Sequence, residues 1–416
     1  MTVSSIEFLV LLLLLSGVFF HLPSNRMKQF VIALCNAGFL YSLIPNPSSW
    51  LLLAAFLLSG YAAAAYLRGH PRRSVFTLYL VILLATFIFL QRYDALAYVL
   101  PPSMLRHSFR IVGLSYILFR QIHFVVDSMQ GQIKDPSLWT YLNYQMNLFT
   151  LLAGPIQSYQ NFSSTWKRRE PVLTDFHALL KSYMRIFLGV IKIAGVATAC
   201  LFAYNELSAQ LFHAYLGWYP LGWLTVILKF GGIFYLYPAY VYFNFSGYCD
   251  IVIATGALFG EKIPENFDQP YLSRNMIDYW TRWHRTLGFW IRDYTFTPMY
   301  KGIATNWPER ADSLAFLCYF VALFLAGVWH GSTLNFVIFG LLHGAGVSAA
   351  KLWENHLVRT RGRTGLRAYL RSERIRLAAT VATFHFACAT FLVFTPNLGI
   401  TLGILKVFCS AIMSAL

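Results

Sequence analysis

Long apolar runs alternate with short polar connections along most of the chain. Several runs are close to the length of one membrane crossing: Phe8–Phe20, Trp50–Leu67, Val75–Leu90, Leu314–Val328 and Leu377–Phe394. A membrane-spanning helix needs about 20 mostly apolar residues, and in lipid only helices and closed barrels satisfy their own backbone polar groups. The pattern therefore predicts an all-α polytopic membrane protein with about eleven transmembrane helices, short and broken ones included.

The composition supports this prediction. Of the 416 residues, 57% are hydrophobic and only 12% are charged, about half the charged share of an ordinary soluble domain. The first apolar segment has neither a basic region before it nor a small-residue cleavage site after it, so we interpret it as a retained helix. The six cysteines are scattered and contain no C-x-x-C pair, which argues against a disulfide or zinc scaffold.

We interpret the chain as a single membrane domain, residues 1–416, because it has no obvious linker or repeat. The lengths of the apolar runs and the charges between them differ from one part of the chain to another. We expect four parts: scaffold helices (1–110), a core with broken and amphipathic segments (111–350), a basic cytoplasmic loop (351–376) and closing helices (377–416).

The net charge of +16 does not indicate nucleic acid here, because basic loops of membrane proteins face the cytoplasm and contact anionic lipid headgroups. The first and third connections, residues 21–29 and 68–73, are basic, whereas the second, Pro45–Ser49, carries no charge. Lys351–Arg376 contains eight Lys and Arg residues against two Glu. This distribution predicts an external N-terminus and a cytoplasmic C-terminus.

Two segments depart from the simple pattern of spans. In "LLAGPIQSYQNF" (151–162) a Gly-Pro interrupts an apolar run, and non-helical backbone at membrane depth requires protein or a wet cavity to satisfy it. Residues 271–300 combine arginines, aspartates and a histidine with three tryptophans. That segment is too charged to span, so we expect helices that lie in the interface, on the cytoplasmic side, or line a polar cavity.

His330 is the first candidate for chemistry, because it follows an apolar run in "GVWHG". We expect it near the external side, at a turn between two helices, where Gly331 and Ser332 suit a close connection. An imidazole in an apolar region needs a cavity or a partner, and it exchanges a proton near neutral pH. A catalytic base and a hydrogen-bonded structural histidine are both open interpretations. Asn335 either orients His330 or begins the next helix.

His343 and His284 are the other histidines of interest. His343 falls on another face and nearer the cytoplasm, and we interpret it as a packing residue that supports the site. His284 lies in the arginine-rich segment 271–300. It is either a polar group near a donor with phosphates or a thioester, or a satisfied surface histidine.

"YFNFSGYCDIVIATGALFG" (242–260) places Tyr248 and Asp250 in an apolar helix. A buried carboxylate needs a partner. We expect Asp250 to pair with an arginine of segment 271–300.

Several motifs together resemble the membrane-bound O-acyltransferase family. They are "GLSYILFRQIHFVVDSMQG" (113–131), "FSGYCDIVIATGALFGEKIPENFDQPYLSRNMIDYWTRWHRTLGFWIRDY" (245–294) and "GVWHGSTLNFVIFGLLHG" (327–344), in the family's order. The resemblance is to the bacterial branch that contains alginate and peptidoglycan O-acetylation proteins and the teichoic-acid D-alanyl transfer protein. It covers about residues 110 to 400.

The resemblance implies that His330, in the Trp-His-Gly motif, and His284, in the Arg-Trp-His motif, are the catalytic histidines. It further implies a ring of helices around a thinned centre, with a channel from a cytoplasmic donor to an external acceptor. Residues implied to line the channel or bind the donor are Arg282, Trp283, Arg285, Asn335, Tyr248 and Asp250. No bound cofactor is expected; the donor is a thioester, acetyl-CoA or an acylated carrier protein.

The implied function is transfer of an acyl group towards hydroxyls of a cell-surface polysaccharide or a partner acyltransferase, in the inner membrane of a bacterium. Implied partners are membrane lipids, an extracytoplasmic acyltransferase or acceptor protein, and a cytoplasmic acyl carrier protein. Many relatives have Trp-His-Ile-Ser-Leu-Ser where this chain has Trp-His-Arg-Thr-Leu-Gly (283–288). We favour acetyl as the acyl group, with D-alanyl as the alternative.

Two other classes stay open. A transporter would use the buried His, Asp and Arg residues as a substrate or proton path, although it would be expected to contain inverted repeats. A non-catalytic scaffold of a polysaccharide export complex would not need His284 or His330.

Overall fold

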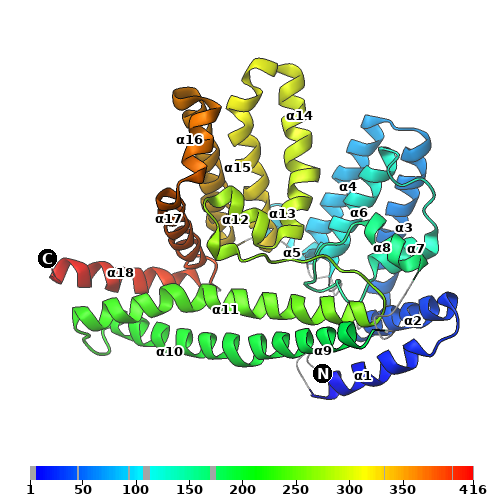
Figure 1. The fold of residues 1–416 in the computed structure, drawn as a ribbon, viewed down its shortest axis with the longest axis horizontal. Helices are drawn as coiled ribbons and strands as arrows, with labels where there is room; N and C mark the ends of the chain where they lie inside the picture. Colours follow the sequence, from blue (N-terminus) through cyan, green and yellow to red (C-terminus); the bar gives the residue numbers. More distant parts are fainter. Residues whose placement is uncertain are drawn as a thin grey trace. The chain divides into compact units, whose positions relative to one another are not determined.

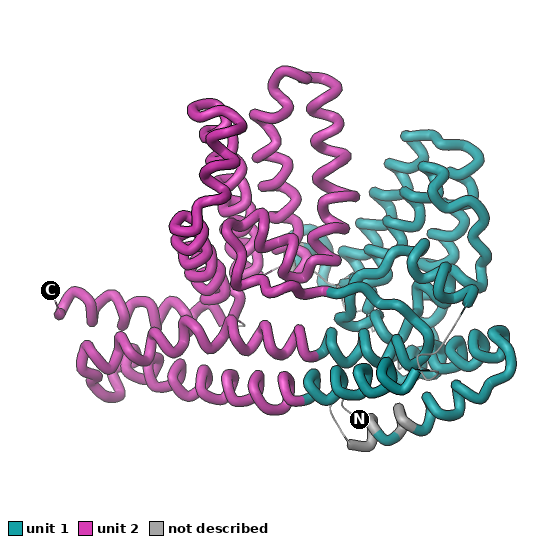
Figure 2. The backbone as a smooth tube through the Cα atoms, in the orientation of Figure 1, with its two compact units in different colours: residues 1–190, 248–265 teal, residues 191–247, 266–416 magenta. Residues whose placement is uncertain are grey.

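The structure is a computed structural model that describes residues 6–44, 46–91, 94–105, 113–168, 175–331, 333–395 and 397–415. The described residues form helices and their connections, without a β-strand. The expected boundary between residues 110 and 111 lies outside them, as do Pro45 and Ser332. The chain divides into two compact units, residues 1–190 with 248–265 and residues 191–247 with 266–416 (Figure 2).

Seven helical runs among the described residues are long and apolar enough to cross a membrane, which makes the chain a polytopic membrane protein. They are Pro47–Gly69, Arg73–Gln91, Phe176–Tyr215, Trp223–Leu258, Pro308–His330, Leu334–Arg371 and Leu398–Ala415.

The first unit consists mainly of α1 to α9 (Figure 1). Their bounds are α1 Ile6–Phe20, α2 Asn25–Leu43, α3 Pro47–Gly69, α4 Arg73–Gln91, α5 Pro102–Leu105, α6 Leu114–Met129, α7 Leu138–Gln145, α8 Tyr159–Lys167 and α9 Phe176–Val190, with a 3₁₀ turn at Asp94–Tyr98. An apolar core joins α2, α3, α4 and α6 through residues such as Leu40, Phe56, Leu83 and Ile117.

The interrupted segment between α7 and α8 is held by one polar face of α6. Arg120 donates to the carbonyl oxygens of Tyr144 and Gln145, both at 2.8 Å, which satisfies the end of α7. The ring Nε2 of His123 accepts from the backbone N–H of Tyr159 at 2.9 Å, which satisfies the start of α8. The break expected in this region is therefore compensated by buried protein groups, as irregular backbone in an apolar setting requires.

The second unit contains most of α10 to α18. Their bounds are α10 Thr198–Tyr215, α11 Trp223–Leu258, α12 Met276–Arg282, α13 Arg285–Ile291, α14 Thr297–Asn306, α15 Ala311–His330, α16 Leu334–Arg371, α17 Glu373–Phe391 and α18 Leu398–Ala415. Pi-helical stretches occupy Ile191–Ala197 and Arg292–Phe296, and 3₁₀ turns occupy Pro270–Leu272 and Pro308–Arg310. The unit boundary passes through α11 after Gly247. Residues 351–376, which we expected to form a loop, belong instead to the end of α16 and the start of α17, with Ser372 between them.

Two packing groups build the second unit. Within it, α10, α18 and residues 223–247 of α11 lie side by side (Figure 1) and share an apolar core that includes Leu211, Ile233 and Ile404. α15 and α16 form a hairpin whose backbones approach closely, because a Cβ on Gly340 would come within 2.7 Å of the Phe324 carbonyl oxygen. Such small-residue contacts are a common way to pack membrane helices.

Candidate functional site

His330 is the last residue of α15, at the closed end of the α15–α16 hairpin. Its ring is half-buried and lies among aromatic side chains, with centroid distances of 4.8 Å to Trp329 and 5.2 Å to Phe394. Within the described part of the chain, neither ring nitrogen of His330 has a hydrogen-bond partner. The imidazole is therefore positioned by packing, and its nitrogens are available for a substrate.

His284 is the residue before α13 and adopts a left-handed conformation, φ 42° and ψ 46°. Its side chain is almost completely buried, at 3% exposure, and the ring edge meets Phe245 at 4.8 Å. A non-glycine residue in this backbone region costs about 1–2 kcal/mol. The sharp turn between α12 and α13 thus holds the imidazole inside the unit, which overrules the interpretation of His284 as a surface residue.

Asn266 sets the tautomer of His284. Its side-chain oxygen accepts hydrogen bonds from the Thr286 hydroxyl at 2.8 Å and from the Thr286 backbone N–H at 3.4 Å. That oxygen lies 3.1 Å from Nδ1 of His284, so Nδ1 must be the donor. Burial, with a smaller contribution from His330, lowers the pKa of His284 to about 3. A neutral imidazole protonated at Nδ1 keeps a lone pair at Nε2.

The structure brings His284 and His330 into one electrostatic neighbourhood. A positive charge on His330 would lower the pKa of His284, so the two imidazoles are within electrostatic range of each other. The surrounding rings include Phe339 and Phe394 beside His330, and Trp283 against Phe391 at 5.4 Å. Both imidazoles are therefore bordered by apolar aromatic rings, where electrostatic interactions are stronger than in bulk water.

His343 differs because both of its ring nitrogens bind protein. Nδ1 accepts from Trp280 Nε1 at 3.1 Å, and Nε2 lies 2.9 Å from the hydroxyl of Thr390. An indole N–H is only a donor, so Nδ1 is unprotonated and Nε2 donates. His343 links α12, α16 and α17 and has no lone pair left for a substrate.

Asn335 is buried near the start of α16 and binds other partners than His330. Its amide nitrogen donates to the Thr395 carbonyl at 2.8 Å, and its oxygen accepts from the Thr333 hydroxyl. These bonds attach the start of α16 to the connection between α17 and α18.

The arginines beside His284 are paired with nearby carboxylates. Arg282 donates to Asp278 at 2.8 Å, and Arg285 lies 3.7 Å from Asp268 while its guanidinium covers the Phe289 ring. Both arginine side chains are about one-third exposed. A donor phosphate that approaches them competes with these carboxylates.

Tyr248 and Asp250 belong to the first unit, and the expected partner of Asp250 needs correction. The arginine that pairs with it is Arg185 of α9, at 2.9 Å, which lies outside segment 271–300. Arg185 also binds both oxygens of Glu265 at 2.6 Å. Asp250 is thus part of an ion-pair cluster that joins α9 to α11.

Two groups of polar residues were not anticipated from the sequence. One is Asn266, which has no motif of its own. The other is the polar face of α6, where Arg120, His123 and Asp127 recur at helical spacing and are all buried. Ionisable residues at intervals of three and four within an apolar helix were a signal that could have found this face.

A multi-span helical chain that places two histidines among aromatic rings has the architecture of an integral membrane enzyme. The chain belongs to the membrane-bound O-acyltransferase family, whose sequence model matches residues 72–370. It is therefore a membrane O-acyltransferase.

Relatives of two kinds are similar to the chain. Teichoic acid D-alanyltransferase of Bacillus subtilis is 29% identical over 293 residues, and that of Streptococcus thermophilus is 26% identical over 299; both matches cover 68% of this chain and 68% of the relative. The probable alginate O-acetylase AlgI of Pseudomonas fluorescens is 26% identical over 259 residues, which is 61% of this chain and 47% of that protein. The chain thus matches about half the length of this alginate relative.

Proposed function

We propose that the protein transfers an acetyl group from a thioester donor on the cytoplasmic side of a bacterial inner membrane to a hydroxyl on the outer side. The observation that carries the proposal is the half-buried His330 at the end of α15, which lies among aromatic rings and has no hydrogen-bond partner among the described residues. In the same unit, His284 is held at Nδ1 by Asn266. The acceptor hydroxyl belongs to a cell-surface polysaccharide or to a partner acyltransferase. The arrangement we infer around this pair is a ring of about eleven spans with a central channel, N-terminus outside and C-terminus inside.

The reaction uses one proton. His330 accepts the proton of the acceptor hydroxyl as its oxygen attacks the thioester carbonyl carbon, the carbon–sulfur bond breaks, and His330 returns the proton to the departing sulfur. His284, neutral and protonated at Nδ1, accepts a hydrogen bond at Nε2 from an N–H group of the donor and so positions the thioester. Arg282, Arg285 and Trp283 lie next to His284 in sequence and guide the phosphate-bearing donor, acetyl-CoA or an acylated carrier protein.

We favour acetyl over D-alanyl as the transferred group because the rings around the two histidines are uncharged. An ammonium group, which D-alanine carries, is expensive to bring into such surroundings unless it is paired. D-alanyl transfer is the second candidate, supported by the matches that cover 68% of the length of the D-alanyltransferase relatives. It would use a carrier protein as the donor.

The test compares His330→Ala with a matched variant, His385→Ala, in a strain that lacks the native copy. His385 is an exposed histidine bonded to Tyr235 in the same unit. Cells receive radiolabelled acetate or D-alanine, and label in the cell-surface polymer is measured at equal protein levels. We expect His330→Ala to reduce incorporation by about 10²–10⁴-fold, the usual contribution of a general base, and His385→Ala to leave it unchanged.

The two labels separate the candidates. Histidine-dependent incorporation of acetate supports the first candidate, and histidine-dependent incorporation of D-alanine alone replaces it with the second. If His330→Ala incorporates both labels as wild type does, the proposed mechanism is wrong. Flux of a radiolabelled substrate through proteoliposomes without any thioester would instead indicate a transporter.

A further inference from the structure

A cavity in the second unit lies away from the histidines. It has a volume of about 360 Å³ and is bounded by the start of α12, the later part of α16, and α17. This volume falls within the range of about 300–1,000 Å³ typical of small-molecule sites. Its walls are largely apolar, with Met276, Leu357, Leu366, Leu370, Ile375 and Phe386 among the lining side chains.

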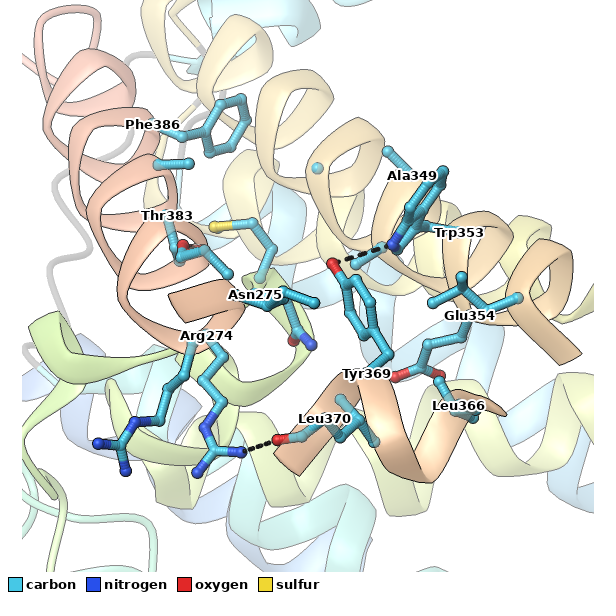
Figure 3. A pocket seen from close by; sticks show the side chains of 18 residues that line it. Arg274, Asn275, Ala349, Trp353, Glu354, Leu366, Tyr369, Leu370, Thr383 and Phe386 are labelled. Atoms are coloured by element: carbon cyan, nitrogen blue, oxygen red, sulfur yellow. Dashed lines mark hydrogen bonds between the residues drawn. The ribbon is translucent and has the colours of Figure 1, made fainter. Parts of the chain in front are cut away.

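A kink creates one wall of this cavity. Gly362 has φ 65° and ψ 178°, which ends the regular helix of α16 and starts a separate helical piece, residues 363–371. Tyr369 from this piece accepts a hydrogen bond from the indole N–H of Trp353 at 3.1 Å (Figure 3). The cavity is thus closed on one side by a short helix that folds back over α16.

The short helix is amphipathic in a particular way. Leu366, Tyr369 and Leu370 line the cavity, whereas Arg363, Arg367 and Arg371 recur every four residues. At 100° per residue these arginines form a stripe next to the apolar face, not opposite it. Among the described residues, none of the three arginines has a carboxylate partner. A basic stripe bordering an apolar face is typical of helices that bind anionic membrane surfaces.

Arg274 adds an unpaired positive charge at the cavity itself. Its guanidinium is exposed and donates to the Leu370 carbonyl oxygen at 3.1 Å (Figure 3). Within the described part of the chain the guanidinium has no carboxylate partner, whereas the backbone N–H of Arg274 donates to Asp278 at 3.1 Å. The two acidic side chains of residues 351–376 each have a basic partner. Glu354, which also lines the cavity, pairs with Lys351, and Glu373 pairs with Arg376.

We propose that this cavity binds one anionic phospholipid, with an acyl chain among the apolar side chains and the phosphate against Arg274 and the arginine stripe. The apolar walls suit a hydrocarbon chain, and a free nucleotide or sugar phosphate would find few hydrogen-bonding groups there. The positive charges select an anionic headgroup. Met276 contributes to the cavity and begins α12, so the bound lipid also holds the helix that leads to His284.

The test uses the full chain in detergent with photoreactive phosphatidylglycerol or phosphatidylcholine of identical acyl chains. Two variants probe the two parts of the site: Arg274→Gln removes the charge, and Ala379→Phe fills the cavity from α17. Each has a matched control. Arg68→Gln changes an exposed arginine that likewise donates to a backbone carbonyl, and Ala378→Phe changes the exposed neighbouring position on α17.

We expect phosphatidylglycerol to label residues 363–386 more strongly than phosphatidylcholine. One basic residue near an anionic headgroup changes affinity by about fivefold, so Arg274→Gln is expected to weaken labelling by that factor. Ala379→Phe abolishes it, and both controls keep it. Equal labelling by the two lipids, or wild-type labelling of Ala379→Phe, would overturn the proposal, as would an equal loss in Arg68→Gln. Lipid labelling is measured independently of acyl transfer, so the lipid site can be confirmed or excluded whether or not the proposed function is correct.

Discussion

Asn266 accepts a hydrogen bond from Nδ1 of His284, and the same oxygen accepts from Thr286. The contact joins two residues eighteen positions apart, one in a loop and one between two short helices. It converts a buried imidazole, which has two possible neutral tautomers, into one with a defined acceptor at Nε2. The ring nitrogen of His284 that carries the lone pair is therefore determined by Asn266.

Replacing Asn266 with leucine should allow the neutral His284 ring to carry its proton on either nitrogen. The variant removes the acceptor of Nδ1–H of His284, and a buried donor left unsatisfied costs about 1–3 kcal/mol. We expect a lower free energy of unfolding and a mixture of ring tautomers, detected by ¹⁵N NMR of histidine-labelled protein. Asn275→Leu is the matched control, because Asn275 caps α12 with a bond of 2.8 Å but does not touch His284.

Asn266→Asp provides the complementary variant. A carboxylate keeps the acceptor but adds negative charge, which raises the pKa of His284 from its low value. We expect its ring to become protonated near neutral pH and acyl transfer to fall there while the fold persists. If the Nδ1–H signal of His284 is unchanged in Asn266→Leu, the assignment of the tautomer to Asn266 is incorrect.

Stability should depend on pH through His284. Its pKa is about 3 in the folded protein and about 6.5 when unfolded. Between these values the unfolded chain binds a proton that the folded protein does not, so stability is complete above pH 6.5 and falls as the pH decreases towards 3. Each pH unit inside that window changes the free energy of unfolding by up to about 1.4 kcal/mol.

The measurement is the thermal midpoint in detergent at half-unit steps from pH 4 to 8, for wild type and His284→Gln. Other groups contribute to both curves, so the difference between the two slopes isolates His284. Parallel curves would contradict the buried neutral state.

The sequence allowed prediction of those features that follow from local patterns. Apolar runs predicted a helical polytopic membrane protein, which is confirmed. The position of His330 at a helix end also followed from the pattern. Contacts between residues far apart in sequence could not be predicted from the pattern, because side-chain periodicity contains no information about which helix faces which. Asp250 and Arg185 are 65 residues apart, whereas segment 271–300 is the source of arginines that is nearer in sequence.

Contacts made by residues in loops were also beyond prediction from the sequence. Asn266 lies in an irregular connection that no periodicity describes, so its contact with His284 could not be predicted from the sequence. His343 shows the opposite case: a packing histidine beside Gly344 was a reasonable interpretation of the sequence, and the structure supplies the bonds to Trp280 and Thr390 that such a residue needs.

His343 should matter for stability more than for proton transfer. His343→Leu removes an acceptor from the indole N–H of Trp280 and a donor to Thr390, and we expect a loss of about 2–4 kcal/mol from the two unsatisfied groups and the altered packing. His343→Gln can accept from Trp280 and donate to Thr390, and should recover part of that loss. Thermal unfolding measures both. Full stability in His343→Leu would show that these bonds do not stabilise the contact between α12 and α17.

Arg120 should be essential for the first unit, because its planar guanidinium satisfies three acceptors at once. It donates to the carbonyl oxygens of Tyr144 and Gln145 and to the Thr150 hydroxyl, and its side chain is 1% exposed. Arg120→Met leaves these acceptors buried without donors, at about 1–3 kcal/mol each. Arg120→Lys supplies one ammonium without the fork geometry and should recover only a fraction of the lost stability.

The loss is measured by proteolysis of segment 146–158 and by the thermal midpoint. Arg68→Met is the control, since Arg68 makes one exposed bond to Lys134. Equal resistance to proteolysis in wild type and Arg120→Met would mean that the segment between α7 and α8 is held by other contacts.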